Sequence, residues 1–131
     1  MPMVSVIMPV FNAGDGSELE QAIQSILQQT FADFELIICD DASTDDTWEH
    51  LQKWAAMDSR IVLLQNAVNQ KAGAARNCCI NQSQGRFIAF MDADDISAPN
   101  RLQTQLEFLK NHPEIAFVGA RVNFFIKFPV I

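Results

Sequence analysis

The chain has 131 residues, 49% of them hydrophobic, and carries a formal net charge of −7 at pH 7. This length is typical of a single domain with a buried core. The acidic balance argues against a nucleic-acid-binding protein, because such proteins need a basic face to meet the phosphate backbone. It leaves a nucleotide ligand open, since a bound metal ion can supply the positive charge.

The sequence carries no signal for export or membrane insertion. The first residues lead directly into an apolar segment without a basic region or cleavage site, so we expect no signal peptide. No apolar run approaches the roughly 20 residues that a transmembrane segment requires. Cys39, Cys78 and Cys79 fit neither a disulfide framework nor a zinc motif. We therefore expect the three thiols to be reduced, as is usual in a cytoplasmic protein.

Apolar segments with two different periods alternate along the chain. Short β-rich runs predict strands at residues 4–10, 34–39, 61–64, 87–91 and 115–119. Apolar residues at helical spacing predict helices around residues 19–27, 48–55, 72–82 and 102–109, with Ser17 and Ser97 as N-caps. This alternation predicts an α/β fold, a Rossmann-like parallel sheet with helices on both faces. The unbroken run at 87–91 predicts a strand buried on both faces.

Polar side chains follow the strands at one edge of this predicted sheet. In parallel α/β sheets, ligands bind at the carboxyl ends of the strands. The residues at these ends are carboxylates and amides, namely Asn12, Asp40, Asp41, Asn66, Asn69, Asp92, Asp94 and Asp95. Strand-to-helix turns also host helix caps, but capping alone does not require two clusters of aspartates. We therefore expect a functional rim at this edge.

The densest part of this rim is the segment Asp92-Ala93-Asp94-Asp95. Three carboxylates this close repel one another, and a cation or solvent must offset the repulsion. The segment is either a site for a hard metal ion or a solvated acidic turn before a helix.

Several other chemistries find no support in the sequence. No glycine-rich phosphate loop follows the first strand, and neither a GxxxxGK[ST] nor a GxSxG motif occurs. Arg76 and Lys71 are the cations best placed to meet a phosphate, because both follow the third strand on the polar rim. A solvated helix start explains these two cations equally well.

Taken together and in order, these segments resemble glycosyltransferase family 2, whose members have the GT-A fold. The resemblance covers nearly residues 3–119 and rests on segments 4–12 (VSVIMPVFN), 22–31 (AIQSILQQTF), 40–45 (DDASTD), 75–77 (ARN) and 92–95 (DADD). It implies a hexosyltransferase that transfers a sugar, with inversion, from a nucleoside diphosphate donor such as a UDP-sugar. The acceptor would be a sugar or a lipid-linked sugar in polysaccharide or glycolipid assembly. The protein would act in the cytoplasm, at a peripheral position on the inner face of the membrane.

The resemblance also implies roles for individual residues. Pro9, Phe11 and Asn12 would line the pocket for the base and ribose. Asp41, with Asp40 beside it, would accept a hydrogen bond from the uracil ring. Arg76 would lie near the base or the diphosphate. The DxD region, Asp92, Asp94 and Asp95, would hold Mn²⁺ or Mg²⁺ against the diphosphate.

Two departures from the family pattern affect these expectations. Lys71 stands where the family usually has a glycine, and if that position needs a positive φ, we expect a reshaped loop here. The family's general base is an acidic residue of the acceptor-binding half, and no Asp or Glu follows Glu114 here.

We therefore expect residues 1–131 to form one donor-binding domain that lacks the acceptor half. A non-catalytic nucleotide- or metal-binding module that acts through a partner chain is the alternative. The apolar segment 124–131 would allow a homo-oligomer.

Overall fold

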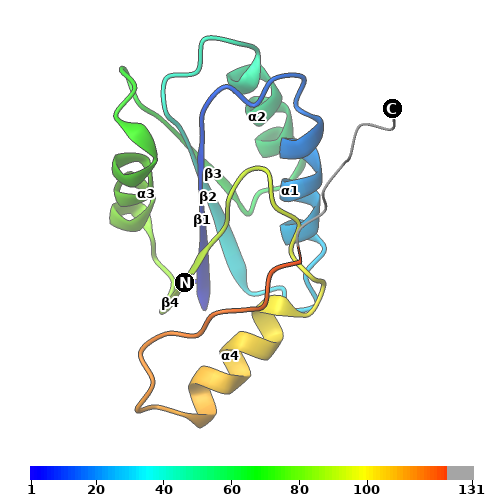
Figure 1. Ribbon diagram of the computed structural model, residues 1–131, viewed down its shortest axis with the longest axis vertical. Coiled ribbons are helices and arrows are strands. Elements are labelled where there is room, and N and C mark those ends of the chain that lie inside the picture. Colours follow the sequence, from blue (N-terminus) through cyan, green and yellow to red (C-terminus); the bar gives the residue numbers. More distant parts are fainter. Residues whose placement is uncertain (124–131) are drawn as a thin grey trace.

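The computed structural model describes residues 1–123 and shows strands and helices in alternation (Figure 1). The strands are β1 (Val4–Val10), β2 (Phe34–Asp40), β3 (Ile61–Gln65) and β4 (Phe87–Phe90). The helices are α1 (Ser17–Leu27), α2 (Thr47–Met57), α3 (Lys71–Gln82) and α4 (Arg101–Asn111). None of the helices in the described part of the chain combines the length and the apolar character that crossing a membrane requires.

The four strands form one parallel sheet in the order β3-β2-β1-β4, which confirms the predicted fold class. From β1 the chain builds outward to β2 and β3, and then returns to place β4 on the other side of β1. The direction in which successive strands are added therefore reverses between β1 and β4, and α/β sheets bind their ligands at such a switch point. The pairing of Ile7 with Phe90 brings the residues after β4 beside Pro9.

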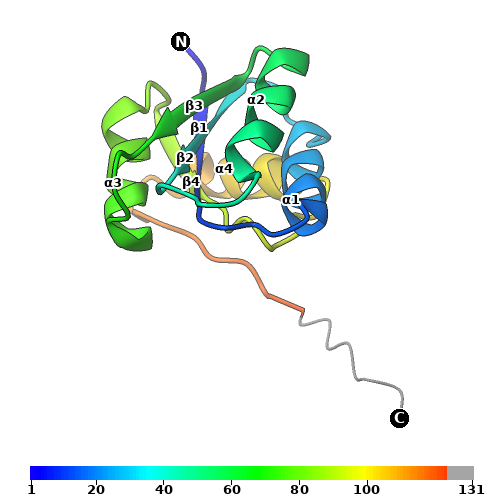
Figure 2. The same cartoon turned by 90° about the horizontal axis from the view of Figure 1, so that it is seen from above.

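The core divides into two layers, one on each face of the sheet. Alternate residues of β1, such as Val6 and Met8, pack with apolar residues of α1, α2 and α4. Ile7 faces the other way and packs with Ile37 and with Ala75 of α3. Figure 2 shows this arrangement from above, with α3 on one side of the sheet and α1 and α2 on the other.

The prediction that β4 is buried on both faces is wrong. Phe87 and Ala89 pack against the larger core layer, but Ile88 and Phe90 are 41% and 57% exposed. The reason is that α3 lies over β1 and β2, so the outward face of β4 is left uncovered by the described residues. An apolar run alone could not distinguish this edge strand from a central one.

Two further predictions about the end of the chain are wrong. Residues 115–119 form no strand and pair with nothing in the sheet, although their composition is β-rich. Helix α4 begins at Arg101 with Asn100 as its N-cap, so Ser97 lies in the preceding loop and does not cap it. The predicted cap Ser17 is wrong as well, because it is the first residue of α1 and Gly16 is the N-cap. The apolar segment 124–131 lies outside the described residues.

Gly85 lies against the backbone of β1, where an added Cβ atom has no room. A Cβ atom at this position would lie 2.5 Å from the Ser5 nitrogen and 2.7 Å from the Val4 carbonyl carbon. We therefore expect Gly85→Ala to destabilise the fold by about 3 kcal/mol, because the backbone of β1 would have to move. Urea denaturation measures this change. Gly73→Ala is the matched control, since its added Cβ meets no atom within 4 Å and should stabilise α3 by up to ~1 kcal/mol.

Candidate functional site

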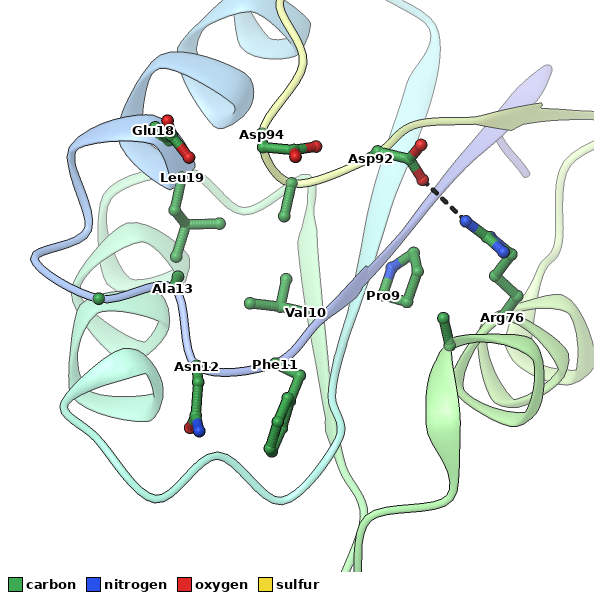
Figure 3. A pocket seen from close by; sticks show the side chains of 13 residues that line it. Pro9, Val10, Phe11, Asn12, Ala13, Glu18, Leu19, Arg76, Asp92 and Asp94 are labelled. Atoms are coloured by element: carbon green, nitrogen blue, oxygen red, sulfur yellow. Dashed lines mark hydrogen bonds and ion pairs between the residues drawn. The ribbon is translucent and has the colours of Figure 1, made fainter.

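A hollow of about 570 Å³ opens at the carboxyl ends of β1 and β4, at the point where the strand order reverses. The residues predicted for the site that line it are Pro9, Phe11, Asn12, Arg76, Asp92 and Asp94. Figure 3 shows Asp92 and Asp94 on one side of this hollow and Phe11 and Asn12 on the other. The fold thus brings together six predicted residues that lie as far apart in sequence as positions 9 and 94.

Arg76 and Asp92 form an ion pair within this hollow. Nη2 of Arg76 donates to Oδ1 of Asp92 at 2.8 Å, with 36% and 54% of the two side chains exposed (Figure 3). An ion pair this exposed contributes little to stability, because solvent screens it. Both charges thus remain available to a ligand that enters the hollow. An arginine can bind a phosphate with two parallel hydrogen bonds.

The third carboxylate of the acidic segment lies apart from the hollow. Asp95 is absent from its lining residues, and the Asp95 nitrogen donates to the Asp92 carbonyl to close a turn. Partial burial and the neighbouring charges of Asp94 and Asp92 raise the pKa of Asp95, while Arg101 opposes this shift. Within residues 1–123, no three Asp, Glu, His or Cys side chains converge as a metal-binding group. A divalent ion could still fit between Asp92, Asp94 and phosphate oxygens, because Mg²⁺ commonly uses one or two carboxylates plus substrate phosphates.

Asp41 lines a second, smaller hollow of about 210 Å³, which shares Pro9, Val10, Phe11 and Ala72 with the first. Its Oδ1 atom accepts hydrogen bonds from Asn66 Nδ2 at 2.7 Å and from the Gln70 nitrogen at 2.9 Å. Burial alone would raise the pKa of Asp41, but these hydrogen bonds outweigh it and lower the pKa below its usual value. The carboxylate is therefore ionised at neutral pH and held in one orientation.

Asp40 is fully buried and lines neither hollow. Its carboxylate accepts hydrogen bonds from the Ser43 hydroxyl at 2.5 Å and from Gln65 Nε2 at 3.2 Å. In this structure Asp40 ties the loop after β2 to the end of β3. The predicted contact of Asp40 with a nucleotide stays a prediction.

Asn12 is held by the loop that follows β2. Its nitrogen donates to the Ser43 hydroxyl, and its side-chain oxygen accepts from the Thr44 nitrogen at 2.8 Å. Asn12 also has a positive φ of 46°. In residues 1–123, the only other non-glycine residues with positive φ are Ala42 and Lys71, which follow β2 and β3. Strained backbone thus gathers at the rim that carries the hollows, as it often does at functional sites.

Asp45 fixes the same loop and gives the fold a dependence on pH. Its carboxylate accepts from the Thr47 hydroxyl, the Thr47 nitrogen and the Gly14 nitrogen, and the bond from the Thr47 side chain contributes most to lowering its pKa. A lowered folded-state pKa stabilises the fold above the unfolded value of 3.8 and loses this effect as the pH falls below it. We expect urea denaturation between pH 6 and pH 3 to show a shallower loss of stability for Asp45→Asn than for the wild type. An unchanged slope would contradict this role.

Lys71 adopts the conformation that the family's glycine would favour. Its φ is +72°, so the loop keeps a positive φ at this position despite the side chain. A left-handed conformation costs a lysine roughly 1–2 kcal/mol, and a glycine at this position avoids that cost. The greater freedom of glycine in the unfolded state offsets part of this gain in stability. We therefore expect Lys71→Gly to stabilise the fold by up to ~1 kcal/mol in urea denaturation. A loss of stability would show that Lys71 makes compensating contacts.

Glu18 also lines the larger hollow, and sequence reasoning did not identify it. It lies in the first turn of α1, where acidic residues are common because they interact favourably with the helix dipole, so nothing in the sequence set it apart. Sequence reasoning likewise missed Ser43 and Thr44 as the residues that hold Asn12, and Asp45 as the residue that holds Gly14.

A parallel α/β sheet with carboxylates, amides and an arginine at its switch point defines a ligand-binding α/β domain. The chain belongs to glycosyl transferase family 2, because the model of this family matches residues 5–130. This match confirms the resemblance found in the sequence.

The curated relatives extend well beyond the matched region. The putative glycosyltransferase EpsE of Bacillus subtilis is 42% identical over 130 residues, which are 98% of this chain and 46% of the relative. The UDP-Glc:alpha-D-GlcNAc-diphosphoundecaprenol beta-1,3-glucosyltransferase WfaP of Escherichia coli is 39% identical over 110 residues, 84% of this chain and 42% of the relative. This chain therefore spans less than half the length of either relative.

Solved structures confirm the GT-A fold. S. aureus TarS in complex with UDP-GlcNAc matches 84% of this chain and 32% of its own, with a TM-score of 0.75 and 28% identity. The mannosyltransferase PcManGT of Pyrobaculum calidifontis, in complex with GDP-Man and Mn²⁺, matches 82% of this chain and 32% of its own, with a TM-score of 0.75 and 25% identity.

Proposed function

We propose that this chain is the donor-binding portion of an inverting glycosyltransferase and that its donor is a UDP-sugar. The observation that carries the proposal is the convergence of Asp41, Arg76, Asp92 and Asp94 on adjoining hollows at the switch point of the sheet. Membership of glycosyl transferase family 2 supports the reaction class. The UDP donor named for WfaP and the UDP-GlcNAc complex of TarS support the choice of nucleotide.

The smaller hollow would take the nucleoside. Phe11 is 50% exposed there and offers an aromatic ring against which a base can stack. The Asp41 carboxylate is an acceptor beside that ring, and a uracil ring presents one N–H donor. Pro9 and Asn12 would border the ribose.

The larger hollow would take the diphosphate and the sugar. Arg76 would exchange its pairing with Asp92 for the diphosphate oxygens. Asp92 and Asp94, with Asp95 as a third candidate, would hold Mn²⁺ or Mg²⁺, and the metal complex of PcManGT supports a divalent ion. When bound, such an ion neutralises charge on the leaving diphosphate.

The acceptor would approach from outside the donor hollow. The lipid-linked acceptor named for WfaP supports a polyprenyl-diphosphate-linked sugar and a role in polysaccharide or glycolipid assembly. A direct displacement requires a base for the acceptor hydroxyl. No residue of the described rim is assigned this role.

Isothermal titration calorimetry with UDP tests the donor site directly. We expect the chain to bind UDP in the presence of Mn²⁺ and to bind it more weakly in EDTA. ADP serves as the control nucleotide, because the free ring nitrogens of adenine are acceptors and its only donor is the exocyclic amine, which lies elsewhere on the base than the N–H of uracil. Absence of heat with UDP and Mn²⁺ at millimolar concentration would overturn the proposal.

A further inference from the structure

The three aspartates of the acidic segment lie in a loop with no regular secondary structure. The loop runs from the end of β4 to the start of α4 and contains only two turns, at residues 93–94 and 99–100. The two residues that flank segment 92–96 are buried, with Met91 at 4% and Ser97 at 8% exposure. Such a loop holds its carboxylates in place only if other contacts fasten it, because its own backbone bonds are few.

Arg101 provides a contact that joins the two ends. Its Nη2 donates to the Phe90 carbonyl at 2.7 Å, and its Nη1 donates to the Ser97 hydroxyl at 3.0 Å and lies 3.7 Å from Met91 Sδ. The half-buried guanidinium therefore connects the last residue of β4 with the far end of the loop. It is also the cation that opposes the mutual repulsion felt by Asp95.

A separate set of bonds fastens only the downstream end. Buried Gln29 donates to the Ala98 carbonyl at 2.7 Å and accepts from the Leu102 nitrogen at 3.0 Å. The Ser97 nitrogen also donates to the Ser25 hydroxyl at 3.0 Å. These bonds attach the start of α4 to the end of α1 without Arg101. The loss of Arg101 should therefore loosen the aspartates while α4 stays docked.

We propose that Arg101 is a positioning residue for the donor site: it holds the loop that carries Asp92 and Asp94 against the sheet, where these two carboxylates would hold a divalent ion. This role rests on the proposed function of the acidic segment. Partners that orient metal-binding side chains commonly affect metal affinity or activity by about 10–100-fold when they are removed. We expect a change of that size in the affinity for UDP with Mn²⁺.

The test compares Arg101→Met and Arg101→Lys with the wild-type chain by calorimetry and by thermal unfolding. Arg101→Met should weaken UDP binding about 10–100-fold in Mn²⁺ and leave binding in EDTA unchanged. Arg101→Lys should lose part of this affinity, because an ammonium group keeps the charge but cannot replace the planar fork.

Arg60→Met is the matched control for lost packing and hydrogen bonds. Arg60 is also half-buried, donates to Asp58 and to the Leu27 carbonyl, and lies before β3, at the opposite end of the sheet from the acidic segment. It should lower the unfolding temperature about as much as Arg101→Met without affecting UDP affinity.

The outcomes separate two kinds of failure. If the wild-type chain does not bind UDP with Mn²⁺, the donor site is overturned and the role of Arg101 with it. If the wild type binds and Arg101→Met binds equally well, only the positioning role is overturned. Full affinity in Arg101→Lys would also overturn it, because charge without the planar fork would then suffice.

Discussion

Asp94→Asn should weaken UDP binding about 100-fold in the presence of Mn²⁺ and leave binding in EDTA unchanged. The carboxylate of Asp94 faces the larger hollow together with Asp92 (Figure 3). In the proposed site it neutralises and ligates a hard cation, and an amide does this much less well. Removing a residue that only orients a metal ligand commonly lowers metal affinity or activity ~10–100-fold, and removing a direct ligand should lower UDP affinity at least as much.

Two controls make this expectation specific. Asp33→Asn removes an exposed carboxylate just before β2, at the opposite end of the sheet, and should leave UDP affinity unchanged in both buffers. Inorganic pyrophosphate with Mn²⁺ should follow the same loss in Asp94→Asn, because it carries the diphosphate without the base. An equal loss in Mn²⁺ and in EDTA would show that Asp94 contacts the nucleotide without a metal.

The sequence predicted the rim of the site because two simple rules combine there. Hydrophobic periodicity predicted five strands and four helices, and four of these strands and all four helices form. Their alternation requires a parallel sheet, and such a sheet places the carboxyl ends of all its strands at one edge. Residues as distant as Asn12 and Asp94 could therefore be assigned to one site before any contact was known.

Neighbouring aspartates show where this reasoning stops. Asp40 and Asp41 look alike in sequence, but consecutive residues at the end of a strand point in different directions. Asp40 turns inward to Ser43 and Gln65, whereas Asp41 lines the smaller hollow. Only the positions of these partners decide which aspartate faces a ligand.

The errors at β4 and at residues 115–119 have a related cause. Both segments are apolar enough for a buried strand, yet burial depends on what packs against them. Ile88 and Phe90 are exposed because no described helix covers that face, and residues 115–119 find no strand to pair with among the described residues. Composition specifies what a segment could bury, and tertiary neighbours determine whether it does.

Asp41→Ala should weaken UDP binding by a similar factor with and without Mn²⁺, in contrast to Asp94→Asn. Asp41 lines the nucleoside hollow and offers its carboxylate to the base, so its contribution does not pass through a metal. The substitution should also destabilise the fold by about 1–3 kcal/mol, because Asn66 Nδ2 and the Gln70 nitrogen lose their acceptor. Calorimetry in both buffers and urea denaturation measure the two effects.

Asn66→Ala separates base recognition from stability. It removes the donor to Asp41 but leaves the carboxylate in place, held by the Gln70 nitrogen. We expect it to lose about 1 kcal/mol of stability and to keep most of the affinity for UDP. Binding of pyrophosphate with Mn²⁺ should survive in Asp41→Ala, since that ligand has no base. If Asp41→Ala instead lost pyrophosphate and UDP equally, Asp41 would support the whole rim and would not read the base.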